Sequence, residues 1–198
     1  MEIQAGDWVM TRPTEGNESL FQKGILLFSK HTHDELVGVQ DGKLVVGNAT
    51  TPYFTLTPFS DRLKECMDGK KVMGIYRLKE FHRVHNVDGY KYYRDGVIQC
   101  LNLLARLQIP YDKKAIVSHM RNYIRSYVPF LPPKISKHRE SKVFCTESCF
   151  IINELLGFDL YNYIGEQPLV APCHAEKLYY DEHLVPVADY GLASYLER

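Results

Sequence analysis

The first half of the chain carries short apolar runs separated by polar turns, a pattern typical of β-strands. One run follows a Gly-Asp turn at residues 6–10. The stretch 35–50, ELVGVQDGKLVVGNAT, holds two runs separated by Asp41-Gly42, a dipeptide typical of a tight hairpin. A further run, KVMGIYRL, lies at residues 71–78. These runs predict a small antiparallel sheet.

Helical spacing dominates later in the chain. Apolar residues recur at intervals of three and four over 90–107, which predicts a long helix ending before Pro110. A second helix is predicted over 113–127, followed by a proline-rich basic segment at 129–142 that we interpret as a loop or a lid. Another helical pattern begins at Cys145 and stops at a glycine. Strands followed mainly by helices predict an α+β fold.

The length and charge of the chain limit the number of domains and the classes of partner to be expected. The 198 residues suit one domain spanning 1–198, and 45% hydrophobic residues exclude wholesale disorder. Because 24 basic side chains balance 24 acidic ones, no overall field favours nucleic acid as a partner. The N-terminus lacks the layout of a signal peptide, and no apolar run reaches membrane-spanning length, so we expect a cytoplasmic protein without an integral membrane segment.

The chain has five cysteines at irregular spacing, which argues against a disulfide framework. Cys145 lies at the start of a predicted helix, where unpaired backbone N–H groups and the helix dipole stabilise a thiolate. Cys149 shares a helical face with Ile152 and Leu156 and is expected in the core. Free cysteines are most often buried structural residues, so position alone makes Cys145 only a candidate nucleophile.

A thiol nucleophile also needs a base, usually histidine, and a polar group that orients the imidazole. His31 and His33 directly precede the predicted hairpin, and Asn48 lies on its second strand. The chain therefore supplies histidine, asparagine and cysteine in that order. Taken singly, a histidine pair is more often a solvated loop and an asparagine a turn residue.

Metal binding is a rival use of the same residue types. His31-Thr-His33, the two cysteines at 145 and 149, and Cys173-His174 offer zinc donors. None has the close Cys-x-x-Cys spacing that is typical of a structural zinc site. We therefore expect neither a metal nor a cofactor.

Four segments resemble motifs of the permuted NlpC-type papain-like cysteine amidases and peptidases, in particular their YiiX-like members related to lecithin retinol acyltransferase. Residues 6–9 resemble the opening strand, and THDELVGVQDGKLVVGNA (32–49) resembles the histidine strand and hairpin. LQIPYD (107–112) resembles the segment Gly-x-Pro-Tyr-Asp, and FCTESCFIINELLG (144–157) resembles the nucleophile motif Tyr-Cys-Ser-Glu-Leu.

This resemblance implies a circularly permuted papain-like fold, with a small antiparallel sheet or barrel packed against helices. It implies Cys145 as nucleophile, His33 as general base and Asn48 as the orienting residue. The implied activity is thiol-dependent cleavage of an amide or ester, or acyl transfer, through a thioester. Peptides, peptidoglycan stems or lipid acyl groups would be the substrates, without a cofactor.

Two departures from the family pattern affect this interpretation: the position of the histidine, and Thr146-Glu147-Ser148-Cys149 in place of Ser-Glu-Leu-Val after the nucleophile. Leu36 stands at the usual place of the histidine, and His33, three residues earlier, has the opposite strand parity. His33 is therefore expected to reach the site only through a bulge or extra turn at 34–36, with His31 as a substitute base. Without such a base, the chain would be an inactive papain-like domain that binds a peptide or lipid. Glu147 is expected to be structural or to contact substrate.

Overall fold

The computed structural model describes residues 1–83, 87–112, 144–164 and 170–197. The predicted helix at 113–127 and the predicted loop or lid at 129–142 lie outside the described residues. Within the described residues, no helix combines the length and apolarity needed to cross a membrane.

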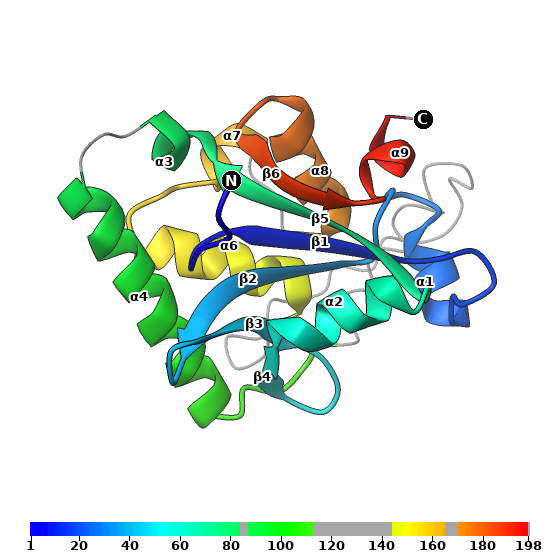
Figure 1. Ribbon diagram of the computed structural model, residues 1–198, viewed down its shortest axis with the longest axis horizontal. Helices are drawn as coiled ribbons and strands as arrows, with labels where there is room; N and C mark the ends of the chain where they lie inside the picture. Colours follow the sequence, from blue (N-terminus) through cyan, green and yellow to red (C-terminus); the bar gives the residue numbers. More distant parts are fainter. Residues whose placement is uncertain (84–86, 113–143, 165–169, 198) are drawn as a thin grey trace, which may run out of the picture.

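Six strands form one open, fully antiparallel sheet in the order β4-β3-β2-β1-β5-β6 (Figure 1). The predicted hairpin is confirmed as β2 and β3, and its turn places Asp41 and Gly42 at φ of 51° and 73°. The α+β class is confirmed, with an open sheet rather than a barrel. The strands are β1 (Trp8–Pro13), β2 (His33–Gln40), β3 (Lys43–Ala49), β4 (Phe54–Pro58), β5 (Lys71–Leu78) and β6 (Leu184–Tyr190).

Helices surround this sheet, and the longest matches the predicted helix at 90–107 to within a few residues. The described helices are α1 (Leu20–Ile25), α2 (Phe59–Met67), α3 (Lys79–Arg83), α4 (Val87–Arg106), α6 (Cys145–Leu155), α7 (Tyr161–Ile164), α8 (Pro172–Tyr180) and α9 (Ala193–Leu196).

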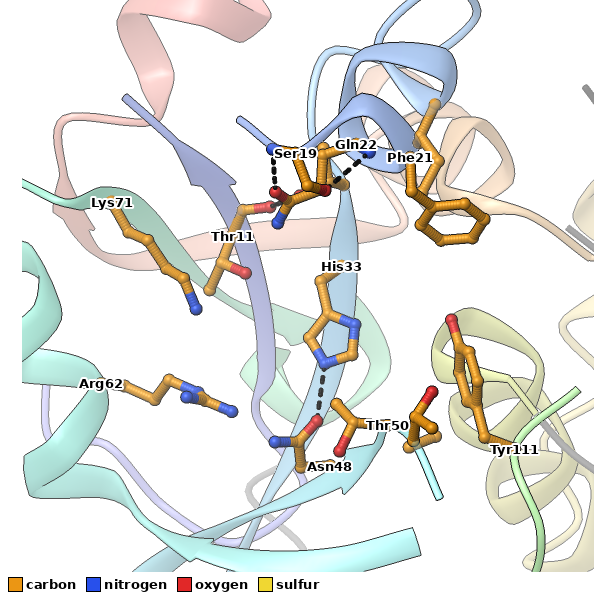
Figure 2. Close-up of a pocket in the computed structure, with 14 residues that line it drawn as sticks. Thr11, Ser19, Phe21, Gln22, His33, Asn48, Thr50, Arg62, Lys71 and Tyr111 are labelled. Atoms are coloured by element: carbon orange, nitrogen blue, oxygen red, sulfur yellow. Dashed lines mark hydrogen bonds between the residues drawn. The ribbon is translucent and has the colours of Figure 1, made fainter. Parts of the chain in front are cut away.

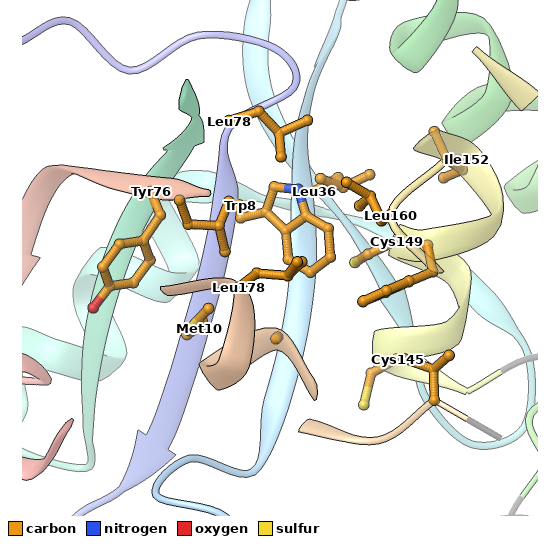
Figure 3. Packing of buried hydrophobic residues seen from close by; sticks show 14 of the residues in the cluster. Trp8, Met10, Leu36, Tyr76, Leu78, Cys145, Cys149, Ile152, Leu160 and Leu178 are labelled. Carbon is orange, nitrogen blue, oxygen red and sulfur yellow. The ribbon is translucent and has the colours of Figure 1, made fainter. Parts of the chain in front are cut away.

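Alternating residues of the strands belong to two separate hydrophobic clusters, one on each face of the sheet. The larger cluster includes Trp8 and Leu36 and packs against α4, α6 and α8 (Figure 3). The smaller cluster includes Val9 and Val37 and is covered by α2. Neighbouring residues of one strand thus serve opposite faces, as the two-residue period of a strand requires.

Two glycines let α4 approach the sheet closely. A Cβ atom at Gly38 or Gly47 would lie 2.7 or 2.3 Å from a side-chain carbon of Leu101. Such separations are far shorter than a van der Waals contact. The hairpin that carries the candidate histidine and asparagine is therefore packed tightly against α4.

Candidate functional site

Cys145 is the first residue of α6, and its side chain is buried at 1% exposure. Phe144 precedes it in an extended conformation and donates its backbone N–H to Glu147 Oε2 at 3.3 Å. Glu147 therefore caps the helix, which agrees with the structural role expected for it. Figure 3 shows Cys149 one turn deeper in α6, within the large hydrophobic cluster. The helix start thus places Cys145 beside the unpaired backbone N–H groups of the first turn of α6.

His33 begins β2 and meets Asn48 of β3 across the hairpin (Figure 2). His33 Nε2 lies 2.9 Å from Asn48 Oδ1 and 3.3 Å from Glu35 Oε1. Because both oxygens are acceptors, Nε2 carries the hydrogen and donates. The Asn48 amide is held in turn, since its Nδ2 donates to Thr57 Oγ1 at 3.4 Å. Nδ1 is therefore the ring nitrogen left for proton transfer.

Cys145 lies close enough to His33 to influence the pKa of the imidazole. Burial alone lowers the pKa of His33, but the contributions of Cys145 and Glu35 outweigh it and raise that pKa above the ordinary value. The surroundings of His33 therefore favour its cationic, imidazolium form. The structure thus pairs His33 with Asn48 directly and places Cys145 near enough to His33 to raise its pKa.

Glu35 adds a carboxylate beside the base that sequence reasoning did not find. It is fully buried and accepts hydrogen bonds from Arg62 of α2, with Nη2 at 2.7 Å from Oε1 and Nε at 2.9 Å from Oε2. Burial raises the pKa of Glu35, but the hydrogen bonds and charges of His33 and Arg62 outweigh this and lower it to about 2. Glu35 therefore stays ionised next to His33. The available signal was its spacing of two residues from His33, which places both on one face of a strand.

Residues 34–36 form no bulge, which the sequence had made the condition for His33 to reach the site. Pairing runs without a shift from Leu36 opposite Trp8 to His33 opposite Thr11, and the β2–β3 register is regular too. Asn48 lies on the same face of the sheet as His33, so the two side chains meet without any irregularity. Leu36 points to the opposite face and is buried in the large hydrophobic cluster.

A cavity of about 540 Å³ opens beside this group. His33 and Asn48 line it, and Tyr111 faces them in Figure 2. Burial and the charge of Cys145 raise the pKa of Tyr111, so its phenol stays protonated near the thiol. Among the described residues, Cys145 does not itself line the cavity. A ligand in the cavity would meet His33, Asn48 and Tyr111 first.

His31, the suggested substitute base, is not brought to the cavity. It is fully buried, and its two ring nitrogens lie 2.8 Å from Asp34 Oδ1 and 2.9 Å from Glu176 Oε1. Burial lowers its pKa, but the two carboxylates outweigh this and raise it to about 10. A histidine held in this way has no nitrogen free for a substrate.

The fold resembles that of YiiX. The crystal structure of the metalloprotein YiiX from Escherichia coli O157:H7 (DUF1105) matches with a TM-score of 0.56 and 16% identity, over 96% of this chain and 98% of that one. No family model and no curated protein match the sequence. At this identity the likeness to YiiX concerns the fold alone, and it agrees with the YiiX-like motifs in the sequence.

YiiX is described as a metalloprotein, so the donor side chains of this chain require a test. Across the described residues, no group of three or more His, Cys, Asp and Glu side chains is arranged to hold a metal ion. Both nitrogens of His31 are bonded to carboxylates, and His174 Nδ1 accepts the Ala171 backbone N–H at 2.8 Å. We therefore assign no described residue to a metal.

Proposed function

We propose that this protein is a thiol hydrolase or acyltransferase with a permuted papain-like fold, which cleaves an amide or ester through a thioester on Cys145. One observation carries the proposal. Cys145, at the start of α6, interacts with His33, whose Nε2 donates to Asn48 Oδ1 at 2.9 Å. This is the relation of nucleophile, base and orienting amide used by papain-like enzymes.

The proposed reaction begins with attack of the Cys145 thiolate on the substrate carbonyl carbon. Backbone N–H groups of the first turn of α6 stabilise the oxyanion. The His33 imidazolium donates its proton to the leaving amine or alcohol as the carbon–heteroatom bond breaks, which leaves a thioester. A water or another acceptor then gives a proton to His33 and attacks the thioester, which regenerates the thiolate and the imidazolium.

Glu35 and Asn48 support this cycle from the Nε2 side of the imidazole. Asn48 keeps Nε2 protonated and holds the ring orientation, so that Nδ1 takes part in proton transfer. Glu35 stabilises the cationic form of His33 without taking its proton, because its own pKa is lowered to about 2. Asn48 thus orients the imidazole and Glu35 stabilises its positive charge, whereas a single aspartate does both in a Ser-His-Asp triad.

The cavity favours an uncharged acyl group. Besides His33, its cationic side chains are Arg62 and Lys71, and both are already paired, since Arg62 binds Glu35 and both bind Glu65. Threonine, serine and glutamine side chains share the remaining lining with apolar ones such as Phe21, Ile25 and Tyr111. Peptide, peptidoglycan-stem and lipid acyl groups are the substrate classes proposed for it.

Acyl-enzyme trapping tests this function. The protein is incubated with p-nitrophenyl butyrate and with a panel of acyl amides, and intact-mass and peptide-mass spectrometry locate any butyryl group. We expect one butyryl group on Cys145 and release of p-nitrophenol at a rate that Cys145→Ser abolishes. Equal acylation and turnover in Cys145→Ser would contradict the proposal. Cys149→Ser is the matched control, because Cys149 is equally buried in the same hydrophobic cluster but lies one turn further along α6.

A binding domain without catalysis is the second candidate. It is favoured by the 1% exposure of Cys145 and by the presence of Leu36 where the family places its histidine. In that case the cavity would bind a peptide or lipid acyl chain saturably, and no acyl group would appear on Cys145. The trapping experiment separates the two candidates directly.

A further inference from the structure

A second group of ionisable residues lies next to the proposed site and plays no part in the reaction above. The side chains of His31, Asp34 and Thr146 are fully buried, and Glu176 of α8 is 6% exposed. Together we call these four residues the buried clamp. They come from the segment entering β2, from β2, from α6 and from α8, so the clamp joins three separate elements.

Both ring nitrogens of His31, both carboxylate oxygens of Asp34 and the Thr146 hydroxyl have hydrogen-bond partners. The two ring nitrogens of His31 face carboxylate oxygens of Asp34 and Glu176, so both nitrogens donate and His31 is a cation. Glu176 Oε1 also accepts the Ser29 hydroxyl at 2.6 Å and the His31 backbone N–H at 3.1 Å, together with the Lys30 backbone N–H. A neutral imidazole would leave one nitrogen as an acceptor facing a carboxylate.

The clamp reaches the proposed nucleophile through one short hydrogen bond. Thr146 Oγ1 donates to Asp34 Oδ2 at 2.5 Å, while Asp34 Oδ1 is bound to His31. Thr146 follows Cys145 in the chain, and its Oγ1 lies 3.9 Å from the Cys145 sulfur. Asp34 in turn follows His33. A single bond between side chains therefore ties the residue after the nucleophile to the residue after the base.

We propose that the buried clamp positions Cys145 against His33, with His31 as a permanently charged positioning residue rather than a spare base. This proposal rests on the proposed function, because it concerns how Cys145 and His33 are held in the arrangement that the reaction needs. A buried ionic chain is costly to desolvate, and apolar side chains of similar volume often stabilise a fold equally well. What the charges add here is a fixed geometry between β2 and the first turn of α6.

The experiment compares three single variants with the wild-type protein. Thr146→Val keeps the shape but removes the hydroxyl, and Thr146→Ser restores it. Tyr93→Phe is the matched control, because it also removes a buried hydroxyl bonded to α6, at 2.8 Å from Asn153 Oδ1. Amide hydrogen exchange of the peptide covering 144–149 reports the anchoring of α6. The rate of Cys145 alkylation by iodoacetamide at pH 6 reports the thiolate beside His33.

We expect Thr146→Val to speed exchange at 144–149 and to slow alkylation of Cys145 roughly tenfold to a hundredfold, as a displacement of about 1 Å would. Thr146→Ser should restore both values, and Tyr93→Phe should change neither. Unchanged exchange in Thr146→Val overturns the clamp whatever the chemistry of Cys145. Slow alkylation of the wild-type protein itself would instead contradict the proposed function, while the exchange data still decide the clamp. Nitrogen-15 NMR of His31 at pH 8 should show both ring nitrogens protonated, and a neutral ring would also overturn the proposal.

Discussion

Replacing Glu35 by glutamine is the most demanding test of the electrostatics behind the base. The substitution keeps the shape of the side chain but removes a fully buried charge that binds the Arg62 guanidinium through Nε and Nη2 and lies 3.3 Å from His33 Nε2. It leaves two cations facing one another across a neutral amide. The substitution should therefore lower both the free energy of unfolding and the pKa of His33.

The expected loss of stability follows from the remaining partners. Removing one member of a buried ion pair costs about 3–5 kcal/mol because the other charge is left uncompensated. Arg62 keeps Glu65 at 3.2 Å, but that carboxylate is 32% exposed and compensates only in part. We therefore expect Glu35→Gln to lower the free energy of unfolding by about 3 kcal/mol. For a chain of this size this corresponds to a fall of about 6–12 °C in the melting temperature.

Urea unfolding at pH 7, followed by circular dichroism, measures this loss. Glu65→Gln is the matched control, and it should cost less than about 1 kcal/mol because its pairs are partly exposed. The double variant Glu35→Gln/Arg62→Gln should be more stable than Glu35→Gln alone, since it leaves no unpaired guanidinium. Equal, small losses for Glu35→Gln and Glu65→Gln would refute the reasoning.

Three further outcomes are expected. Because the pKa of Glu35 is lowered to about 2, its contribution to stability is present above about pH 4.5 and is lost as the pH falls towards 2; acid titration of wild type against Glu35→Gln should show this difference. His33→Gln should slow alkylation of Cys145 at pH 6 at least about tenfold with little change in melting temperature, and an equal rate would remove His33 as the base. Cys149→Ser should lower the free energy of unfolding by about 1–3 kcal/mol by burying a hydroxyl, whereas Cys145→Ser should lower it by less because Thr146 and His33 lie beside the new hydroxyl; the reverse order in urea unfolding would contradict the assigned roles.

Local patterns were sufficient to predict much of the fold. The Asp41-Gly42 turn adopts the positive φ angles that a tight hairpin requires, and the apolar spacing at 90–107 matches α4. The two cysteines of α6 also lie as the helical period predicted, with Cys145 at the helix start and Cys149 in the core. Each of these features is decided by residues close together in the chain, which is why sequence alone was informative.

Contacts between distant segments could not be predicted in the same way. Glu35 meets Arg62 of α2, and His31 meets Glu176, 145 positions later. No spacing in the sequence encodes either pair, because they depend on how helices pack on the sheet. The bulge was expected for a related reason: strand parity places His33 and Glu35 on one face, but it does not show that Asn48 of the neighbouring strand meets His33 there.

The pH dependence of iodoacetamide alkylation, mapped by mass spectrometry to each cysteine, tests the central claim most directly. Burial raises the pKa of Cys149 well above its ordinary value and raises that of Cys173 to about 12, so these thiols serve as internal controls. We expect Cys145 alone to be alkylated rapidly at pH 6, where ordinary thiols with a pKa of about 8.5 are protonated. Alkylation of Cys145 that is no faster at pH 6 than that of Cys149 would contradict the claim that it is an activated nucleophile.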